Sequence, residues 1–317
     1  MPPEETTTLI LERTNRMLAN LTIGLNPLPW VLTPSGFDLS EPVLRTAFGE
    51  IATTHFRAIH ADPPAGMSAA QYRQLLAEYG LQPAPGYFSM NFHSEPAVDI
   101  VEAAKRHAGM QAELGNTEVF IAAKLTPERI EHPAVGFGED DATLRRVIDG
   151  LGAAAAAITG EGVTPALHPH VASTVEIEPE VRAVLDAIPA SDLSFGPDTG
   201  HLAWAGMTPS MIMADYADRI AAMHLKDVHL DEAEQARAAS ADYMAATVRD
   251  FTVWTEPGRG DVDLLAALET LPSTFPGWVI VEVDVPEAPT NLESTQLSAA
   301  WVTEQLGADV FEAAAGS

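Results

Sequence analysis

The chain contains no cysteine among its 317 residues. Disulfides, thiolate metal ligands and a thiol nucleophile are therefore excluded. The sequence also lacks any apolar run near the ~20 residues that a membrane-spanning helix needs. Its acidic start, Met1-Pro-Pro-Glu-Glu5, lacks the charged-then-apolar order of a secretion signal. These absences predict a cytoplasmic protein without a membrane partner.

Basic residues are scarce, since 17 Lys and Arg stand against 45 Asp and Glu and give a net charge of -28. The few Lys and Arg are scattered singly along the chain and form no basic cluster. A surface this negative repels phosphate backbones, so a nucleic-acid partner is not expected. We interpret the acidic excess as a contribution to solubility.

Apolar strand-like runs alternate with helical patterns along almost the whole chain. The runs predicted as strands are residues 21–25, 56–61, 82–88, 118–123, 164–168, 193–197, 221–225 and 278–283. Apolar residues recur near i, i+3, i+4 and i+7 in the predicted helices, which are residues 69–79, 97–114, 142–158, 178–188, 209–218 and 292–306. Eight strands alternating with helices over this length predict a single (β/α)8 TIM barrel.

We divide the chain into an N-terminal helical extension (1–20), a barrel (21–307) and a C-terminal tail (308–317). A further helix is expected at 231–249, ahead of a turn on the barrel face where active sites lie. The alternative fold is a doubly wound open sheet. It would require a Gly-rich phosphate loop after an early strand, whereas Gly258-Arg-Gly260 comes late and follows no clear strand.

Side chains with N or O donors end the last four predicted strands. They are His168, Asp198, His224 and Glu282. Because the strand ends of a barrel meet on one face, we expect these side chains to surround one point. Two imidazoles and two carboxylates suit Mn²⁺, Co²⁺, Fe²⁺ or Zn²⁺. The alternative is that the histidines are core residues bonded to the backbone, although Asp and Glu are seldom buried unpaired.

Three further polar residues lie close to these strand ends in the sequence. His170 and His201 have three candidate roles: contact with a substrate, support of a ligand by a hydrogen bond, or a place on the surface. Lys226 shares one side of its strand with the histidine two residues earlier. It is a candidate to bind a substrate oxygen, and the alternative is an ion pair with Asp227 or Asp261.

Aromatic residues and one arginine complete the set of candidates. Arg259 lies between glycines in an exposed turn and is placed to close over a polyol, or else is an ordinary loop residue. Trp30, Tyr87 and Phe88 fall near the first and third strand ends, where aromatic rings line a sugar pocket or pack in the core.

Several of these residues belong to motifs that resemble those of one superfamily. The motifs are His168-Pro-His170, Asp198-Thr-Gly-His201, His224-Leu-Lys-Asp-Val228, Pro257-Gly-Arg-Gly260 and Gly277-Trp-Val-Ile-Val-Glu282, with weaker matches at Asn26-Pro-Leu-Pro-Trp30 and Tyr87-Phe-Ser89. They resemble the sugar phosphate isomerase/epimerase superfamily with the xylose-isomerase-like TIM barrel. Within it the chain is most similar to the myo-inosose-2 dehydratases. The resemblance covers roughly residues 21–307.

The resemblance implies a divalent metal, Mn²⁺ or Co²⁺ foremost with Zn²⁺, Fe²⁺ or Mg²⁺ as alternatives, and an inosose or another keto-sugar as substrate. It implies the four strand-end residues as metal ligands, with His201 and Lys226 on substrate oxygens. The implied reaction removes an α-proton, passes through an enediolate and loses a β-hydroxyl as water. Glu282 or His170 is the expected base, His201 the expected acid, and Arg259 and Trp30 further substrate contacts.

Two departures from the family pattern affect the expected reaction. Ala123 and Lys124 stand where the dehydratases carry a Ser-Glu pair, and this change leaves the substrate open. His168 stands where the ketose 3-epimerases carry a Glu that works as acid or base, and this favours elimination over epimerisation.

Other activities within this fold remain as alternatives. They are a sugar isomerase or epimerase, the catalytic subunit of an enzyme that cleaves 3-keto C-glycosides with a partner subunit, and a sugar-binding barrel without catalysis. A DNA-repair endonuclease is disfavoured by the net charge of -28. A homo-oligomer is compatible with such a barrel.

Overall fold

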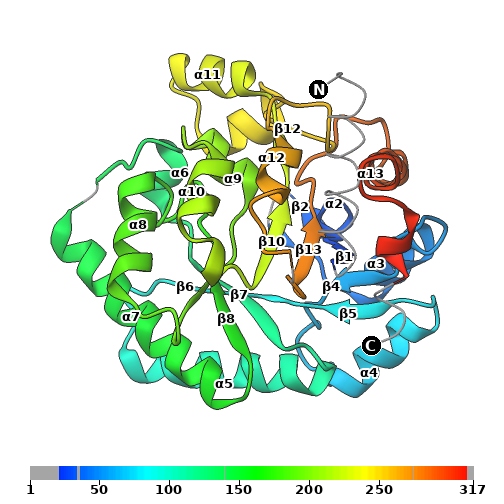
Figure 1. Ribbon diagram of the computed structural model, residues 1–317, viewed down its shortest axis with the longest axis horizontal. Coiled ribbons are helices and arrows are strands. Elements are labelled where there is room, and N and C mark those ends of the chain that lie inside the picture. Colours follow the sequence, from blue (N-terminus) through cyan, green and yellow to red (C-terminus); the bar gives the residue numbers. More distant parts are fainter. Residues whose placement is uncertain (1–20, 34–35, 139, 274, 313–317) are drawn as a thin grey trace, which may run out of the picture.

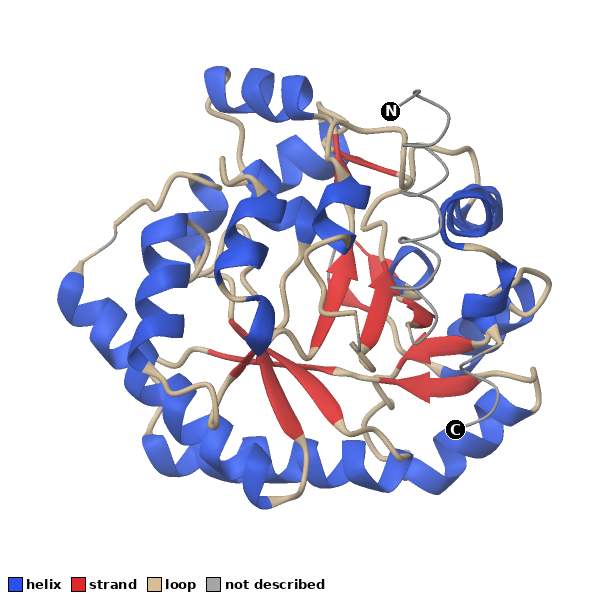
Figure 2. Ribbon diagram, in the orientation of Figure 1, coloured by secondary structure: helices blue, strands red, loops and turns tan. Residues whose placement is uncertain are grey.

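The computed structural model describes residues 21–33, 36–138, 140–273 and 275–312. The predicted extension 1–20 and the end of the predicted tail, 313–317, lie outside the described residues. Helices form the outside of the molecule and surround the strands (Figures 1 and 2). None of the described helices combines the length and apolar character needed to cross a membrane.

Parallel strands form two curved sheets. The first follows the order β10 (Ala222–Leu225), β13 (Trp278–Val281), β1 (Thr22–Leu25), β4 (Ala58–His60) and β5 (Gln82–Ala84). The second follows the order β6 (Tyr87–Met90), β7 (Glu118–Ala123), β8 (Thr164–Leu167) and β9 (Ser194–Phe195). Every neighbouring pair within these sheets is parallel. Within the described residues the two sheets supply eight strand positions, which confirms the predicted (β/α)8 barrel.

The third barrel strand is divided, where the sequence predicted one run over 82–88. Its first half, β5, pairs with β4, and its second half, β6, pairs with β7. The break falls at Gly86, whose N–H donates to the buried Gln111 side chain at 3.1 Å. A Cβ at Gly86 would lie 2.2 Å from Gln111 Nε2, so only glycine fits here.

The two sheets also meet at a second seam, the junction of β9 in one sheet with β10 in the other. Two isolated parallel bridges join the chain there, Phe195 with Ile220 and Asp198 with His224. The Thr199 hydroxyl strengthens this seam, since it donates to the Lys226 carbonyl at 2.7 Å and accepts the Lys226 N–H at 2.9 Å. The seam therefore fixes the ends of β9 and β10 side by side.

Amphipathic helices cover the barrel. They are α3 (Glu41–Ile51), α4 (Ala69–Ala77), α5 (Ala97–Leu114), α7 (Asp141–Gly160), α8 (Glu178–Ala187), α10 (Pro209–Asp215), α12 (Leu264–Leu268) and α13 (Asn291–Leu306), with short 3₁₀ turns η1 (Ala217–Arg219) and η3 (Ala308–Phe311). In α7 the buried Val147, Leu151, Ala154 and Ile158 recur at three- and four-residue spacing. Beyond the predicted barrel boundary at residue 307, Phe311 of η3 is still buried.

A second layer of short elements lies on the carboxyl ends of the strands. It comprises α2 (Leu28–Val31), the hairpin β2 (Leu32–Thr33) and β3 (Gly36–Phe37), α6 (Pro127–Glu131), α9 (Thr199–Trp204), the antiparallel pair β11 (Asp227–Val228) and β12 (Trp254–Thr255), α11 (Leu230–Ala238) and the π-helical turn η2 (Ala245–Arg249). The single helix predicted at 231–249 is wrong. The chain leaves the helical conformation at Ser240, where φ is +55°, and resumes as η2.

A small apolar cluster fills the barrel interior below this layer. Phe120 is its largest member and packs among Ala58, Ala84, Ala222 and Ile280. The small alanines make room for the one large ring. The Phe120 ring forms the floor on which the site described next is built.

Candidate active site

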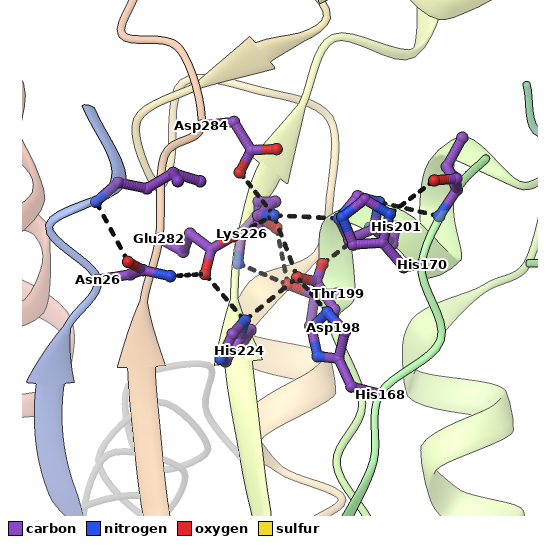
Figure 3. A network of polar contacts seen from close by, with 12 residues as sticks. Asn26, His168, His170, Asp198, Thr199, His201, His224, Lys226, Glu282 and Asp284 are labelled. Atoms are coloured by element: carbon purple, nitrogen blue, oxygen red, sulfur yellow. Dashed lines mark hydrogen bonds and ion pairs between the residues drawn. The ribbon is translucent and has the colours of Figure 1, made fainter. Parts of the chain in front are cut away.

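Asp198 lies at the centre of a group of buried polar residues (Figure 3). It follows β9 and forms the N-cap of α9, where its Oδ1 accepts the His201 N–H at 2.8 Å. Its Oδ2 is buried without a hydrogen-bond partner among the described residues. The capping bond fixes one oxygen and leaves the other directed at the neighbouring strand ends.

His224 and Glu282 lie beside Asp198 on two neighbouring strands. His224 Nδ1 is 3.0 Å from Glu282 Oε2 and 3.6 Å from Asp198 Oδ2. Asn26, which follows β1, donates to Glu282 Oε2 at 2.6 Å. Burial would raise the pKa of Glu282, but Lys226 and His224 hold it well below its usual value. Glu282 is therefore a carboxylate with both oxygens engaged.

His168, after β8, closes the group on its other side. Its Nε2 is 3.9 Å from Asp198 Oδ2, and its ring meets those of His224 and Phe120 at 4.6 and 5.7 Å. Burial and the neighbouring histidines hold its pKa well below 6.5. A neutral imidazole is the form that binds a metal.

The four predicted ligands therefore come together, and their donor atoms fit a divalent cation. Ligand atoms of Asp198, His224 and Glu282 lie within 4.8 Å of one another, and so do those of His168, Asp198 and His201. Asp198 belongs to both groups, and its Oδ2 makes no hydrogen bond among the described residues, with Lys226 Nζ at 3.3 Å as its ion-pair partner. The described residues thus contain a potential metal site of N and O donors.

Lys226 is fully buried next to this group. Its Nζ lies 2.6 Å from Glu282 Oε1, 2.7 Å from Asp284 Oδ1 and 3.3 Å from Asp198 Oδ2. Burial would lower the pKa of Lys226, but the three carboxylates raise it well above 10.5. The Trp254 ring lies against the ammonium at 4.7 Å. Lys226 is therefore a cation held by the site itself.

The two ion-pair partners predicted as alternatives for Lys226 are wrong. Asp227 instead accepts the backbone N–H groups of Val228, Gly258, Gly260 and Val262 at 2.9 to 3.1 Å. Asp261 accepts the Leu230 N–H at 2.8 Å. Both carboxylates therefore shape the loops around residues 227–262, and successive strand residues point to opposite sides, which turns Asp227 away from Lys226.

His201 faces hydrogen-bond donors at both ring nitrogens. The Val171 N–H donates to Nδ1 at 3.3 Å, and Lys226 Nζ lies 3.2 Å from Nε2. Burial holds the pKa of His201 well below 6.5, so the ring is neutral and carries one proton. A backbone N–H and an ammonium can each only donate, so each ring nitrogen of His201 faces a donor.

His170 stacks on His201 with ring centroids 3.7 Å apart. Its Nδ1 lies 2.6 Å from the Val171 carbonyl, which can only accept, so Nδ1 carries the proton. Burial lowers the pKa of His170 to about 4. Its Nε2 makes no hydrogen bond to the described residues, so the lone pair there is available to accept a proton.

Besides Asn26, four residues near the site were not predicted as site residues. Asp284 pairs with Lys226, and the Tyr243 hydroxyl donates to Asp284 Oδ2 at 3.5 Å. Trp254 lies against Lys226, and the His60 ring meets that of His224 at 5.3 Å. Asp284 carried a sequence signal, because it follows Glu282 by two residues on the same side of the strand. Tyr243 carried none, since it lies in the segment predicted as one helix.

The aromatic candidates and Arg259 are placed outside the ion-pair group. Trp30 is half-buried and its indole N–H donates to Glu50 at 2.9 Å. Arg259 is half-exposed and lies 3.4 Å from Glu287 and 3.5 Å from Glu256. Tyr87 lies closer to the site, since its ring meets that of His168 at 5.2 Å, whereas Phe88 packs in the core.

Comparison with known proteins places this geometry in context. The family model of the xylose isomerase-like TIM barrel matches residues 46–305. The inosose dehydratase of Geobacillus thermodenitrificans (strain NG80-2) is 24% identical over 278 residues, which are 85% of this chain and 91% of the relative. The rhizopine catabolism protein MocC of Rhizobium meliloti is 25% identical over 275 residues, or 84% and 82% of the two chains.

Solved structures share the fold. The IOLI protein with a bound zinc atom superimposes with a TM-score of 0.62 and 16% identity, covering 90% of this chain and 98% of its own. The probable 3-DHS dehydratase AsbF of Bacillus anthracis gives a TM-score of 0.62 and 11% identity, covering 89% and 98%. These likenesses extend over the whole barrel.

Proposed function

We propose, since the chain belongs to the xylose isomerase-like TIM barrel family, that it is a divalent-metal-dependent lyase that dehydrates a keto-polyol such as an inosose. The protein is an enzyme of the dehydratase or isomerase/epimerase type, as its named relatives are. The observation that carries the proposal is the buried donor group His168, Asp198, His224 and Glu282 beside a fixed lysine. We place this activity in the barrel, residues 21–307.

His168, Asp198, His224 and Glu282 would hold the metal. A divalent cation bound there supplies Lewis-acid polarisation of a substrate carbonyl, which acidifies the adjacent C–H bond. We expect Mn²⁺ or Co²⁺, and the zinc atom of the IOLI structure supports a divalent ion in this fold. The cluster of buried carboxylates supports the assignment, since Asp198, Glu282 and Asp284 bring more negative charge than the single Lys226 ammonium balances.

His170 is the group that we assign as the base. Glu282, the other predicted base, has both oxygens engaged by Asn26, His224 and Lys226. His170 has a free Nε2 to take the α-proton. The C–H electron pair then forms the C=C bond of an enediolate, and the proton remains on His170.

His201 is the group that we assign as the acid. Its ring proton is given to the departing β-hydroxyl, which leaves as water as the C–O bond breaks. Lys226, whose Nζ lies 3.2 Å from His201 Nε2, stays an ammonium and stabilises the electron pair that the proton leaves on the ring. Arg259 and Trp30 remain proposed contacts with outer parts of the substrate.

The proposed partner is a small keto-sugar or inosose. The net charge of -28 argues against a nucleic acid. We propose a cytoplasmic location, with which the absence of cysteine agrees. Reprotonation of the same enediolate would instead give an isomerase or epimerase. The allulose 3-epimerase of Methylomonas sp. shares the fold with a TM-score of 0.62 and 15% identity.

The test is product analysis with an inosose, ketoses and 3-keto-glycosides, before and after chelation. We expect dehydration of the inosose that is lost on chelation and restored by Mn²⁺ or Co²⁺. An α-deuterated substrate should react more slowly or exchange its label with solvent. Activity that survives thorough chelation would refute the mechanism. Epimerised product alone would identify an epimerase, and no turnover on any substrate would indicate a binding protein.

A further inference from the structure

Asn26 contacts the strand-end group from the first strand of the barrel. It directly follows β1, and its backbone N–H donates to the Val281 carbonyl at 2.9 Å, one residue before Glu282. This bond continues the ladder between β1 and β13, in which Leu25 lies opposite Val281. The ladder brings the Asn26 side chain beside Glu282, and its Nδ2 donates to Glu282 Oε2 at 2.6 Å (Figure 3).

A second hydrogen bond fixes the orientation of the Asn26 amide. Its Oδ1 accepts the Leu28 N–H at 3.1 Å, so the side chain bonds to the backbone two residues further on, as in an Asx-turn. A backbone N–H can only donate, so the carbonyl end of the amide faces Leu28 and the NH2 end faces Glu282. The Leu28 contact alone therefore assigns Asn26 as the donor to Glu282.

The turn formed by residues 26–31 is also held by contacts away from the site. Asn291, the first residue of α13, donates to the Pro29 carbonyl at 3.0 Å. The Trp30 indole N–H donates to Glu50 of α3 at 2.9 Å. Two helices of the outer layer thus fix this turn, which gives the amide at its first position a firm base.

The two oxygens of Glu282 have different kinds of partner. Its Oε1 lies 2.6 Å from Lys226 Nζ, so a full positive charge faces it. Its Oε2 meets the uncharged Asn26 amide and lies 3.0 Å from His224 Nδ1. An amide orients a carboxylate oxygen without bringing a charge of its own, whereas Lys or Arg in its place would compete with a metal ion for that oxygen.

We propose that Asn26 is a positioning residue that holds Glu282 Oε2 in place as a metal ligand beside Asp198 and His224. Hydrogen bonds from a neighbouring group to a ligating carboxylate fix the direction of that carboxylate, and their loss typically costs roughly 10- to 100-fold in metal affinity. This inference rests on the metal site of the proposed function. It concerns the affinity for the metal and is independent of which reaction the metal serves.

Asn26→Ser and Asn291→Ala form a matched pair of variants. Serine at position 26 keeps an oxygen that accepts the Leu28 N–H, as Ser does in such turns, but its short side chain does not reach Glu282. Asn291→Ala removes a hydrogen bond from the same turn, at the Pro29 carbonyl, and leaves Glu282 untouched. The pair therefore separates the contact with Glu282 from support of the turn.

The measurement is the dissociation constant for Mn²⁺, by competition with a chromophoric chelator. We expect the parent and Asn291→Ala to bind Mn²⁺ equally, and Asn26→Ser to bind it roughly 10- to 100-fold more weakly. Unchanged affinity in Asn26→Ser would overturn the proposal. An equal loss in Asn291→Ala would also overturn it, because the cause would then be a loosened turn.

The parent chain gives a second measurement, which stands even where a variant fails to fold. Zn²⁺ is titrated into the ¹⁵N-labelled chain, and the side-chain amide signals of Asn26 and Asn291 are followed by NMR. We expect the Asn26 signal to shift as Zn²⁺ binds, because its acceptor Glu282 becomes a ligand, and the Asn291 signal to stay in place. An Asn26 signal that does not move at saturating Zn²⁺ would refute the positioning role.

These experiments separate the positioning role from the proposed function. A parent chain that binds neither Mn²⁺ nor Zn²⁺ would refute the metal site and the role of Asn26 together. Metal binding that is weakened only in Asn26→Ser, in a parent that dehydrates no keto-polyol, would support the positioning role and refute the proposed reaction. A metal-dependent dehydratase in which Asn26→Ser binds metal as the parent does would refute the positioning role alone.

Discussion

Replacing Lys226 by methionine tests whether its ammonium and a bound metal share the same carboxylates. The Nζ atom is fully buried and lies within 3.3 Å of Glu282, Asp284 and Asp198. Methionine keeps the length of the side chain and the contact with Trp254 but removes the charge. Three buried carboxylates are then left without their cation.

The loss of stability follows from that geometry. Removing one partner of a buried ion pair costs about 3–5 kcal/mol. At ~2 °C per kcal/mol for a large domain, Tm should fall by about 6–10 °C in chelator. With saturating Mn²⁺ the fall should be smaller, because a divalent cation at Asp198 and Glu282 offsets the same charges. The assay is thermal unfolding under both conditions, with the exposed Lys105→Met as the control, which should leave Tm unchanged.

Turnover of Lys226→Met separates binding from structure. A charge-assisted hydrogen bond to a substrate oxygen contributes about 1.5–3 kcal/mol, so kcat/KM should fall roughly ten- to a hundredfold in the metal-loaded variant. An equal fall in Tm with and without metal would refute the shared-carboxylate reasoning. A large fall in Tm with kcat/KM unchanged would show that Lys226 is only structural.

The barrel and the strand-end group could be predicted because both depend on local pattern. Each parallel strand is an apolar run, and the side chain at its carboxyl end is free to point at the common face. Each of the four predicted ligands follows or ends such a run: His168, Asp198, His224 and Glu282. The barrel topology alone was therefore enough to predict that these side chains come together. No distance between elements had to be known.

The breaks in secondary structure could not be predicted, because distant contacts cause them. Gly86 interrupts the third strand to meet Gln111, 25 residues later in the chain. The helix expected at 231–249 ends early although alanine favours it. Tyr243 instead packs on Trp204 with ring centroids 5.4 Å apart and reaches Asp284. Burial of an aromatic ring outweighs a few tenths of a kcal/mol of helix propensity.

The partners of Lys226 depended on strand register. The sequence suggested Asp227 because it is adjacent, yet adjacent strand residues face opposite sides. In the structure β10 pairs with β13 such that Leu225 lies opposite Val281. One residue further along, Lys226 comes beside Glu282, and Asp284 shares that side. Register between two strands more than fifty residues apart is set by packing, and the two sequences alone do not contain it.

Two further predictions concern the metal and the pH dependence of stability. Asp198→Asn keeps an acceptor for the His201 N–H but removes the charge, so it should lose most of its bound metal by elemental analysis; full retention would argue against the ligand set. Burial lowers the pKa of His107 from 6.5 to about 4, so between these values the unfolded chain binds a proton that the folded chain does not. This contribution to stability is present above pH 6.5 and is lost as the pH falls toward 4, by up to about 3 kcal/mol. His107→Phe keeps a ring against Phe88 and should reduce the difference between unfolding free energies measured in urea at about pH 7 and about pH 4.5. An unchanged difference would mean that the folded chain binds this proton as readily as the unfolded one.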